Sequence, residues 1–447
     1  WVSFIEPGRF DGDVAFVTFD NHRNGDKKPY VFKTSDLGKT WKSITTSGIE
    51  GYALSIRQDM VNPNLLFLGT EFGLYISLDG GESWTRFENN MPKVGVRDMV
   101  IQPKANALVM GTHGRGVIII DDISPLRQIT PEVLNENLVF FETKPTILRD
   151  PGAGGGWFGG AGNFVGPNPN KSAQIVYYMK KRHTFGKMYV EIFDQSGNLL
   201  KELPAGKSGG INKVTMPTSL PKPKAAPTDN RMALFGSMSG PNLEEGTYKV
   251  VLTKGKQKYE TSFELKYDEN SPYTSEDRAL QAETVMKLYD LTQDMAYVHH
   301  VLKSISDQSK ELASANSKMA KKLKSLQSKC DEYRNSLVAM GGDGYVNEGE
   351  AIRERISNLY RQVIGYPGRP SQSQINRTDV LMDDMKEIYS ELDEIINSDV
   401  TKVNKALTKK NESATAIVIQ SKEEFLSDDK NKSGSGGSYE EWLELIK

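Results

Sequence analysis

Residues 34–41 read Thr-Ser-Asp-Leu-Gly-Lys-Thr-Trp, and residues 77–84 read Ser-Leu-Asp-Gly-Gly-Glu-Ser-Trp. The two octapeptides share a hydroxyl residue, an aspartate, a glycine, a second hydroxyl residue and a final tryptophan at matching positions. Their tryptophans lie 84 − 41 = 43 residues apart. A run with strand character precedes each octapeptide, at 29–33 and 73–76. The chain therefore repeats one strand-and-turn unit at a fixed spacing.

The shared residues are those that a tight turn after a strand requires. Aspartate and hydroxyl side chains accept hydrogen bonds from turn amides that the strand ladder leaves unpaired. Glycine takes positive φ without penalty, and tryptophan can fold back as an apolar plug. The residues with these structural roles are Thr34, Asp36, Gly38 and Trp41 in the first copy, and Ser77, Asp79, Gly81 and Trp84 in the second.

A period of 43 residues is close to the length of a four-stranded propeller blade. A third, degenerate copy supports it: Gly111-Thr112-His113 aligns with Gly69-Thr70-Glu71, but Asp121-Asp122 replaces the turn and no tryptophan follows. About three blades fit into residues 1–130, whereas propellers close with about four to eight. We therefore expect residues 1–130 to be the last blades of a β-propeller whose other blades lie upstream.

Asp36 and Asp79 are not predicted to be catalytic. Glycoside hydrolysis needs two carboxyl groups that flank one bond. Two successive blades hold these two aspartates apart, so a structural role in the turns is the better interpretation.

The two octapeptides resemble the Asp boxes of BNR-repeat propellers, a group that includes sialidases, xyloglucan-cleaving enzymes and sortilin-type receptors. Residues 111–116 (Gly-Thr-His-Gly-Arg-Gly) and 121–127 (Asp-Asp-Ile-Ser-Pro-Leu-Arg) resemble the end of the last blade in bacterial sortilin-like proteins often labelled "glycosyl hydrolase". The resemblance implies an extracellular, cell-surface or periplasmic protein, and boxes at the blade periphery.

His113, Arg115 and Asp121 are the candidate ligand-facing residues of this region. His113 and Arg115 stand among glycines at the start of a strand, where a propeller face can be lined, and an arginine can grip a carboxylate through two hydrogen bonds. The alternative is that they lock the final blade through local bonds, with Asp121 or Asp122 as partner.

Residues 131–172 are expected to be a linker with a glycine-rich loop at 152–162. This loop lacks the strand and helix context of a dinucleotide fingerprint and the lysine of a phosphate-binding loop. Trp157 and Phe158 inside it form either a contact patch or an anchor on the neighbouring propeller.

Residues 173–272 contain short, mostly alternating runs separated by turn signals, which predict an immunoglobulin- or fibronectin-like β-sandwich.

Residues 273–411 predict a helical coiled-coil or bundle domain. Apolar residues follow a heptad seam from Leu288 to Met340, which indicates one long first helix. Further helices are expected at 350–363 and 378–407, so that the three form an antiparallel hairpin or bundle. Cys330 lies on the seam and is interpreted as a small buried hydrophobe.

Residues 412–447 predict a flexible tail with a short terminal amphipathic helix. Trp442 belongs to that helix. A tethered short apolar segment can serve as a docking peptide or can fold back onto the bundle, and the sequence leaves both readings open.

Composition limits the function classes. The chain has 447 residues, a formal net charge of −2 and one cysteine, so no global charge favours nucleic acid and no multi-thiolate zinc site is available. No apolar run approaches the roughly 20 residues that span a bilayer. We expect no metal and no cofactor.

Two functional hypotheses remain from the sequence. The first is a non-catalytic secreted or envelope scaffold that binds protein or peptide partners. The alternative is a glycoside hydrolase, sialidase-like or xyloglucanase-like, whose catalytic residues lie mostly in missing upstream blades. Whether the chain is an enzyme is therefore left open, with a preference for the scaffold. Both hypotheses allow a glycan as a binding partner.

Overall fold

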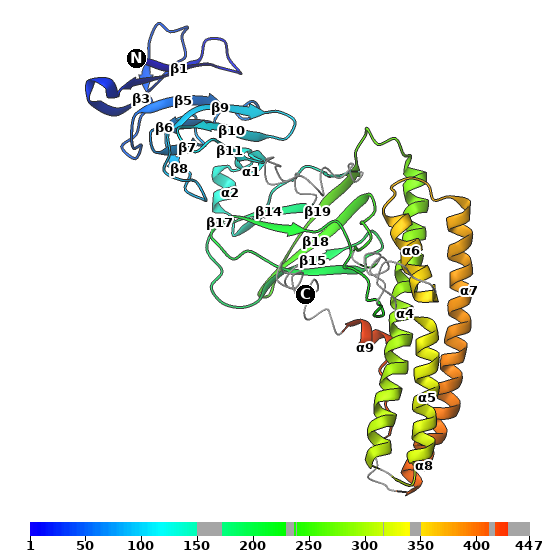
Figure 1. Cartoon of the computed structure of the whole chain (residues 1–447). Helices are drawn as coiled ribbons and strands as arrows, with labels where there is room; N and C mark the ends of the chain where they lie inside the picture. The colour runs from blue at the N-terminus through cyan, green and yellow to red at the C-terminus, as the bar shows by residue number, and fades with distance from the viewer. Residues whose placement is uncertain are drawn as a thin grey trace. The chain divides into compact units, whose positions relative to one another are not determined.

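A computed structural model of the chain describes residues 1–149, 172–228, 237, 239–315, 317–339, 350–410 and 416–427. β-sheets precede a helical region (Figure 1), as the sequence predicts. The chain divides into two compact units. The first comprises Trp1–Thr146, Ala173–Met216 and Thr247–Glu264, and the second comprises Ile147–Ser172, Pro217–Gly246 and Leu265–Lys447.

Three antiparallel sheets follow one another in the first 120 residues. The first sheet has the strand order β1 (Val2–Pro7), β2 (Ala15–Asn21), β3 (Asp26–Thr34), β4 (Lys42–Ser43). The second repeats it with β5 (Ala53–Gln58), β6 (Leu66–Thr70), β7 (Gly73–Ser77), β8 (Thr85–Arg86). The third has only β9 (Val96–Gln102), β10 (Ala107–Thr112) and β11 (Val117–Ile120).

The second sheet is covered on both faces. Leu66 and Leu68 belong to a core shared with Phe16 and Val31 of the first sheet. Their neighbour Phe67 faces the other way, into a core shared with the third sheet. Successive strand residues point to opposite faces, so β6 and β7 are buried at every position. In contrast, β11 alternates between exposed and half-buried residues, because only one of its faces is covered.

Two further sheets follow. A three-stranded sheet has the order β12 (Leu138–Phe140), β14 (Ala173–Met179), β17 (Gly210–Met216). A five-stranded sheet has the order β13 (Thr146–Leu148), β19 (Gln257–Tyr267), β18 (Gly246–Lys254), β15 (Met188–Phe193), β16 (Leu199–Pro204). Alternate residues of β15 and β17 are buried, which agrees with the alternation read from the sequence.

The stretch expected to be a linker contributes strands. β12 pairs with β14, and β13 takes the edge of the five-stranded sheet. Between Arg127 and β12, the short helix α2 (Pro131–Asn135) is capped by Thr130, whose side chain accepts a hydrogen bond from the amide of Val133. Strands this short carry too little alternation to be read from sequence alone.

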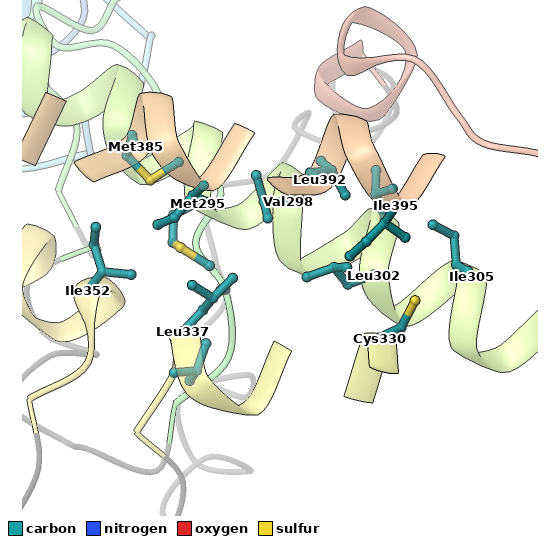
Figure 2. Packing of buried hydrophobic residues seen from close by; sticks show 14 of the residues in the cluster. Met295, Val298, Leu302, Ile305, Cys330, Leu337, Ile352, Met385, Leu392 and Ile395 are labelled. Atoms are coloured by element: carbon teal, nitrogen blue, oxygen red, sulfur yellow. The ribbon is translucent and has the colours of Figure 1, made fainter. Parts of the chain in front are cut away.

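The helical region differs from the prediction at one point. The apolar seam is not a single long helix: α4 (Ser275–Ala315) ends, and α5 (Ala320–Leu337) returns alongside it. Ser306 on α4 donates a hydrogen bond to Asp331 on α5 at 2.9 Å. Because the chain reverses its direction between α4 and α5, the apolar residues of the two helices bury one another, as Figure 2 shows for Leu302 and Cys330.

Two more helical segments complete the bundle core. They are α6 (Ile352–Ile364), and the succession of α7 (Gln372–Glu394), the π-helical turn η2 (Ile395–Val400) and α8 (Thr401–Lys410). Met385, Leu392 and Ile395 pack against residues of α4 in Figure 2. Burial raises the pKa of the Cys330 thiol to about 11 and lowers that of the His299 imidazole to about 4. Both groups are therefore neutral at pH 7.

Two irregular segments pack against these helices. Residues 217–228 reach the bundle core through Ala226, whose carbonyl accepts a hydrogen bond from the buried guanidinium of Arg353. Residues 416–427, which include α9 (Lys422–Ser427), lie along α4 and α8. The side-chain amides of Gln308 and Asn404 each make two hydrogen bonds to this segment's main chain, at Val418 and Ile417 respectively.

Three features of the sequence lie outside the described residues: the glycine-rich loop, its residues Trp157 and Phe158, and the terminal segment with Trp442. Among the described helices, none is long and apolar enough to cross a membrane. All the described residues together contain no group of three or more His, Cys, Asp or Glu side chains that could hold a metal ion.

Candidate binding surface at one edge of the sheets

The first octapeptide forms the connection between β3 and β4. The Asp36 carboxylate accepts hydrogen bonds from the Thr40 amide at 2.9 Å, the Thr40 hydroxyl at 2.6 Å and the Thr34 hydroxyl at 2.8 Å. The Thr34 hydroxyl oxygen in turn accepts the Gly38 amide. These bonds, led by that from the Thr40 hydroxyl, lower the pKa of Asp36. Gly38 has a φ of 79°.

The second octapeptide forms the same turn between β7 and β8. Asp79 accepts hydrogen bonds from the Ser83 amide, the Ser83 hydroxyl and the Ser77 hydroxyl at 2.9, 2.5 and 2.7 Å. The Ser77 oxygen accepts the Gly81 amide. Partial burial acts to raise the pKa of Asp79, but the hydrogen bonds from Ser83 and Ser77 outweigh it and the pKa is lowered. Both aspartates are occupied within their own turns.

A set of polar side chains that the sequence did not single out lies at the opposite edge of the sheets, where the strands end away from the two octapeptide turns. After β2, the Nδ1 atom of His22 lies 2.6 and 2.7 Å from the two carboxylate oxygens of Asp20. The imidazole stacks on the ring of Tyr52 with centroids 4.5 Å apart. Burial raises the pKa of Tyr52, and the carboxylates of Glu71 and Asp20 add to this.

The turn between β6 and β7 brings Glu71 to this edge. Its amide donates to the Tyr52 carbonyl at 3.0 Å. One oxygen of the Glu71 carboxylate lies 4.0 Å from Lys27 Nζ. The other is buried and has no hydrogen-bond partner within the described part of the chain. Asp20 and His22 are neighbours in sequence, but Tyr52 and Glu71 come from two other stretches, and no local motif identifies the set.

The turn between β10 and β11 places His113 and Arg115 at the same edge. The His113 amide donates to the Gly95 carbonyl at 2.8 Å, and Gly95 also lies against the Glu71 main chain. Gly114 and Gly116 have φ of 85° and 65°, which lets the turn expose His113 before them and Arg115 between them. Both side chains are exposed, and neither makes a hydrogen bond or ion pair to other described residues.

Asp121 lies at the other end of β11, also exposed. A strand of four residues spans about 13 Å, so Asp121 does not meet His113 or Arg115. Asp122 accepts the amide of Ser124. The edge that carries His113 and Arg115 therefore unites the turns of three successive sheets without Asp121, and we call the residues Asp20, His22, Tyr52, Glu71, His113 and Arg115 the turn cluster.

Two other carboxylates in the sheets are held by arginines. Asp59 is fully buried and receives two hydrogen bonds from Arg127, at 2.9 and 2.8 Å. Glu6, almost fully buried, pairs with Arg57 at 2.6 Å. Arg127 is the last residue of the segment 121–127, and it ties the end of the third sheet to the second.

Comparison with known proteins gives only distant structural likenesses. No family profile and no curated protein sequence matches the chain. A GH74 enzyme from Niastella koreensis is similar at 14% identity over 59% of this chain and 38% of that chain, with a TM-score of 0.24. The GH74 xyloglucanase from Xanthomonas campestris is similar at 12% identity over 63% and 40%, with a TM-score of 0.24.

A third structure, described as YCF48 bound to D1 peptide, is similar at 11% identity over 56% of this chain and 64% of that chain, with a TM-score of 0.18. The chain thus spans about two fifths of the length of the two GH74 enzymes and under two thirds of the third protein.

Proposed function

We propose that the first three sheets are the last blades of an Asp-box β-propeller of the bacterial sortilin-like group. In this proposal the two later sheets form an immunoglobulin- or fibronectin-like sandwich, and the protein is a non-catalytic scaffold of the cell envelope that binds protein or peptide partners. The two octapeptides with identical turn hydrogen bonds, 43 residues apart, support the propeller.

The observation that carries the binding function is the turn cluster. Three successive sheets bring their turns to one edge, and there the side chains of His113 and Arg115 are exposed and have no hydrogen-bond or ion-pair partner among the described residues. An exposed arginine can bind a carboxylate of a partner with two parallel hydrogen bonds. Asp36, Asp79, Asp59 and Glu6 are in contrast bound within the sheets.

The test is selection of binding peptides from a display library by the whole chain, followed by affinity measurement with variants. Replacing His113 and Arg115 with Ala is expected to weaken binding at least tenfold. The matched control is Lys104→Ala, which removes an exposed cation from the opposite edge of the same sheet and should leave affinity unchanged. Equal affinity of the wild type and the double variant would contradict the proposal.

The alternative function, glycoside hydrolysis, has one observation in its favour. Asp20 and Glu71 place two carboxylates at the same edge, and one Glu71 oxygen is buried without a partner among the described residues. Release of reducing sugar from a glycan panel, lost in both Asp20→Asn and Glu71→Gln, would support the enzyme. Peptide binding without sugar release supports the scaffold.

A further inference from the structure

Exposed lysines gather at one end of the helical bundle. The last turns of α4, the first turns of α5 and the helix α8 lie at the same end in Figure 1. Residues 417 and 418 connect them, because they bond to Asn404 of α8 and Gln308 of α4. We call the exposed lysines of this end the lysine tip: Lys310, Lys318, Lys321, Lys322, Lys324 and Lys405.

The lysine tip differs from nearby lysines in its ion pairing. Within the described part of the chain, none of its six ammonium groups has a carboxylate within ion-pairing distance. Nearby lysines behave differently: Lys303 pairs with Asp307, and Lys329 pairs with Asp399 at 2.7 Å. The charge is therefore concentrated at the end of the bundle, although the whole chain has a net charge of only −2.

The sequence at the start of α5 also opposes helix stability. The first turn of a helix favours acidic side chains, because the unpaired amides there carry partial positive charge. α5 has no acidic residue in its first turn, no side-chain cap at Met319, and lysines at 321 and 322. Lysines in a first turn that favours acidic side chains indicate that an interaction outside the helix favours them.

We propose that the lysine tip attaches the bundle reversibly to an anionic lipid bilayer. The lysines come from α4, α5, α8 and the connection between α4 and α5, all at one end of the bundle, so they fit a broad charged surface. The apolar residues between them, Met319 and Leu323, are buried in the bundle core, so headgroup charge provides the attraction. Each lysine near an anionic surface strengthens attachment by roughly fivefold. The proposal is independent of the turn cluster and its partner.

The experiment is co-sedimentation of the full chain with vesicles of phosphatidylcholine alone or with a third of phosphatidylglycerol. Binding is expected only to the anionic vesicles. It should weaken as ionic strength rises to the physiological value, where the screening length is about 8 Å. The triple variant Lys321→Glu, Lys322→Glu, Lys324→Glu should lower the partition coefficient at least tenfold.

The matched control reverses three lysines elsewhere in the chain, at 254, 256 and 258 around the turn between β18 and β19. It changes the net charge equally and should bind as the wild type does. If the glutamate variant loses helical circular dichroism, the glutamine triple variant replaces it. Equal loss in both variants, retained binding in the tip variant, or binding to heparin without binding to vesicles would each overturn the proposal.

Discussion

The two tryptophan turns have the same internal hydrogen bonds, but their tryptophan side chains make different contacts. Trp84 donates a hydrogen bond from Nε1 to the carbonyl of Ile44, in the preceding sheet, at 2.9 Å, and packs against the core between the two sheets. Trp41 donates to Gly38 of its own turn at 3.2 Å and remains 43% exposed. The same turn therefore packs its tryptophan against the preceding sheet when the described chain contains such a sheet.

The third sheet shows how a sheet is attached to its neighbour when the motif is degenerate. It has no tryptophan, and its end is tied to the second sheet by Arg127 and Asp59. The third sheet is therefore attached to its neighbour by a buried ion pair with two hydrogen bonds, not by a tryptophan. Local turn formation and attachment between sheets are therefore separate properties, and four sets of substitutions distinguish them.

The largest effect is expected for Asp59→Asn. It leaves the buried Arg127 guanidinium without a charged partner, and breaking such a pair costs about 3–5 kcal/mol. Urea unfolding should show this loss. The control is Asp98→Asn, whose carboxylate is 62% exposed and lies 3.4 Å from Arg57, where little change is expected. Similar losses in both variants would mean that burial of the pair is irrelevant.

Trp84→Ala should cost about 2–3 kcal/mol, below the range for a fully buried tryptophan, because the ring is only half-buried. Trp41→Ala should cost under about 1 kcal/mol, since its ring is exposed. Hydrogen exchange of the β6 and β7 amides measures both. A longer polypeptide that adds a preceding sheet should raise the cost at Trp41 toward that at Trp84, and its failure to do so would contradict the propeller.

Gly81→Ala and Gly38→Ala separate backbone strain from packing. Both glycines have positive φ, 100° and 79°, so alanine costs about 1 kcal/mol at each. At Gly81 the new methyl group also meets Ile44 Cδ1 at 2.9 Å, whereas at Gly38 the nearest atom is 3.7 Å away in Trp41. The Gly81 variant should melt at the lower temperature, and a reversed order would show that packing between the sheets is loose.

The smallest effect concerns pH. The folded-state pKa values of Asp36 and Asp79 are lowered by their turn hydrogen bonds. Each therefore stabilises the fold fully above its unfolded pKa near 4, and this contribution is lost as pH falls through the lower folded pKa. The stability gap between wild type and Asp79→Asn should be constant at neutral pH and shrink below about pH 4. A gap that widens in acid would contradict the assigned hydrogen bonds.

The sequence by itself determined the elements whose bonds or pattern lie within a few residues. The octapeptides, the alternating strand at 173–179 and the helix near 352–364 follow from hydrogen bonds and periodicity inside one segment. The placement of His113 and Arg115 on an exposed turn follows from the glycines beside them. The roles expected for Trp157, Phe158 and Trp442 stay predictions.

Only the tertiary structure decided which segments meet. It turned the apolar seam back on itself between Ala315 and Ala320, and it joined Asp20, His22, Tyr52 and Glu71 to the turn of His113. It also brought Lys405 to the end of the bundle that carries the lysines of α5. These contacts depend on how strands and helices pair across long separations, and side-chain periodicity records which face is buried but not which partner buries it.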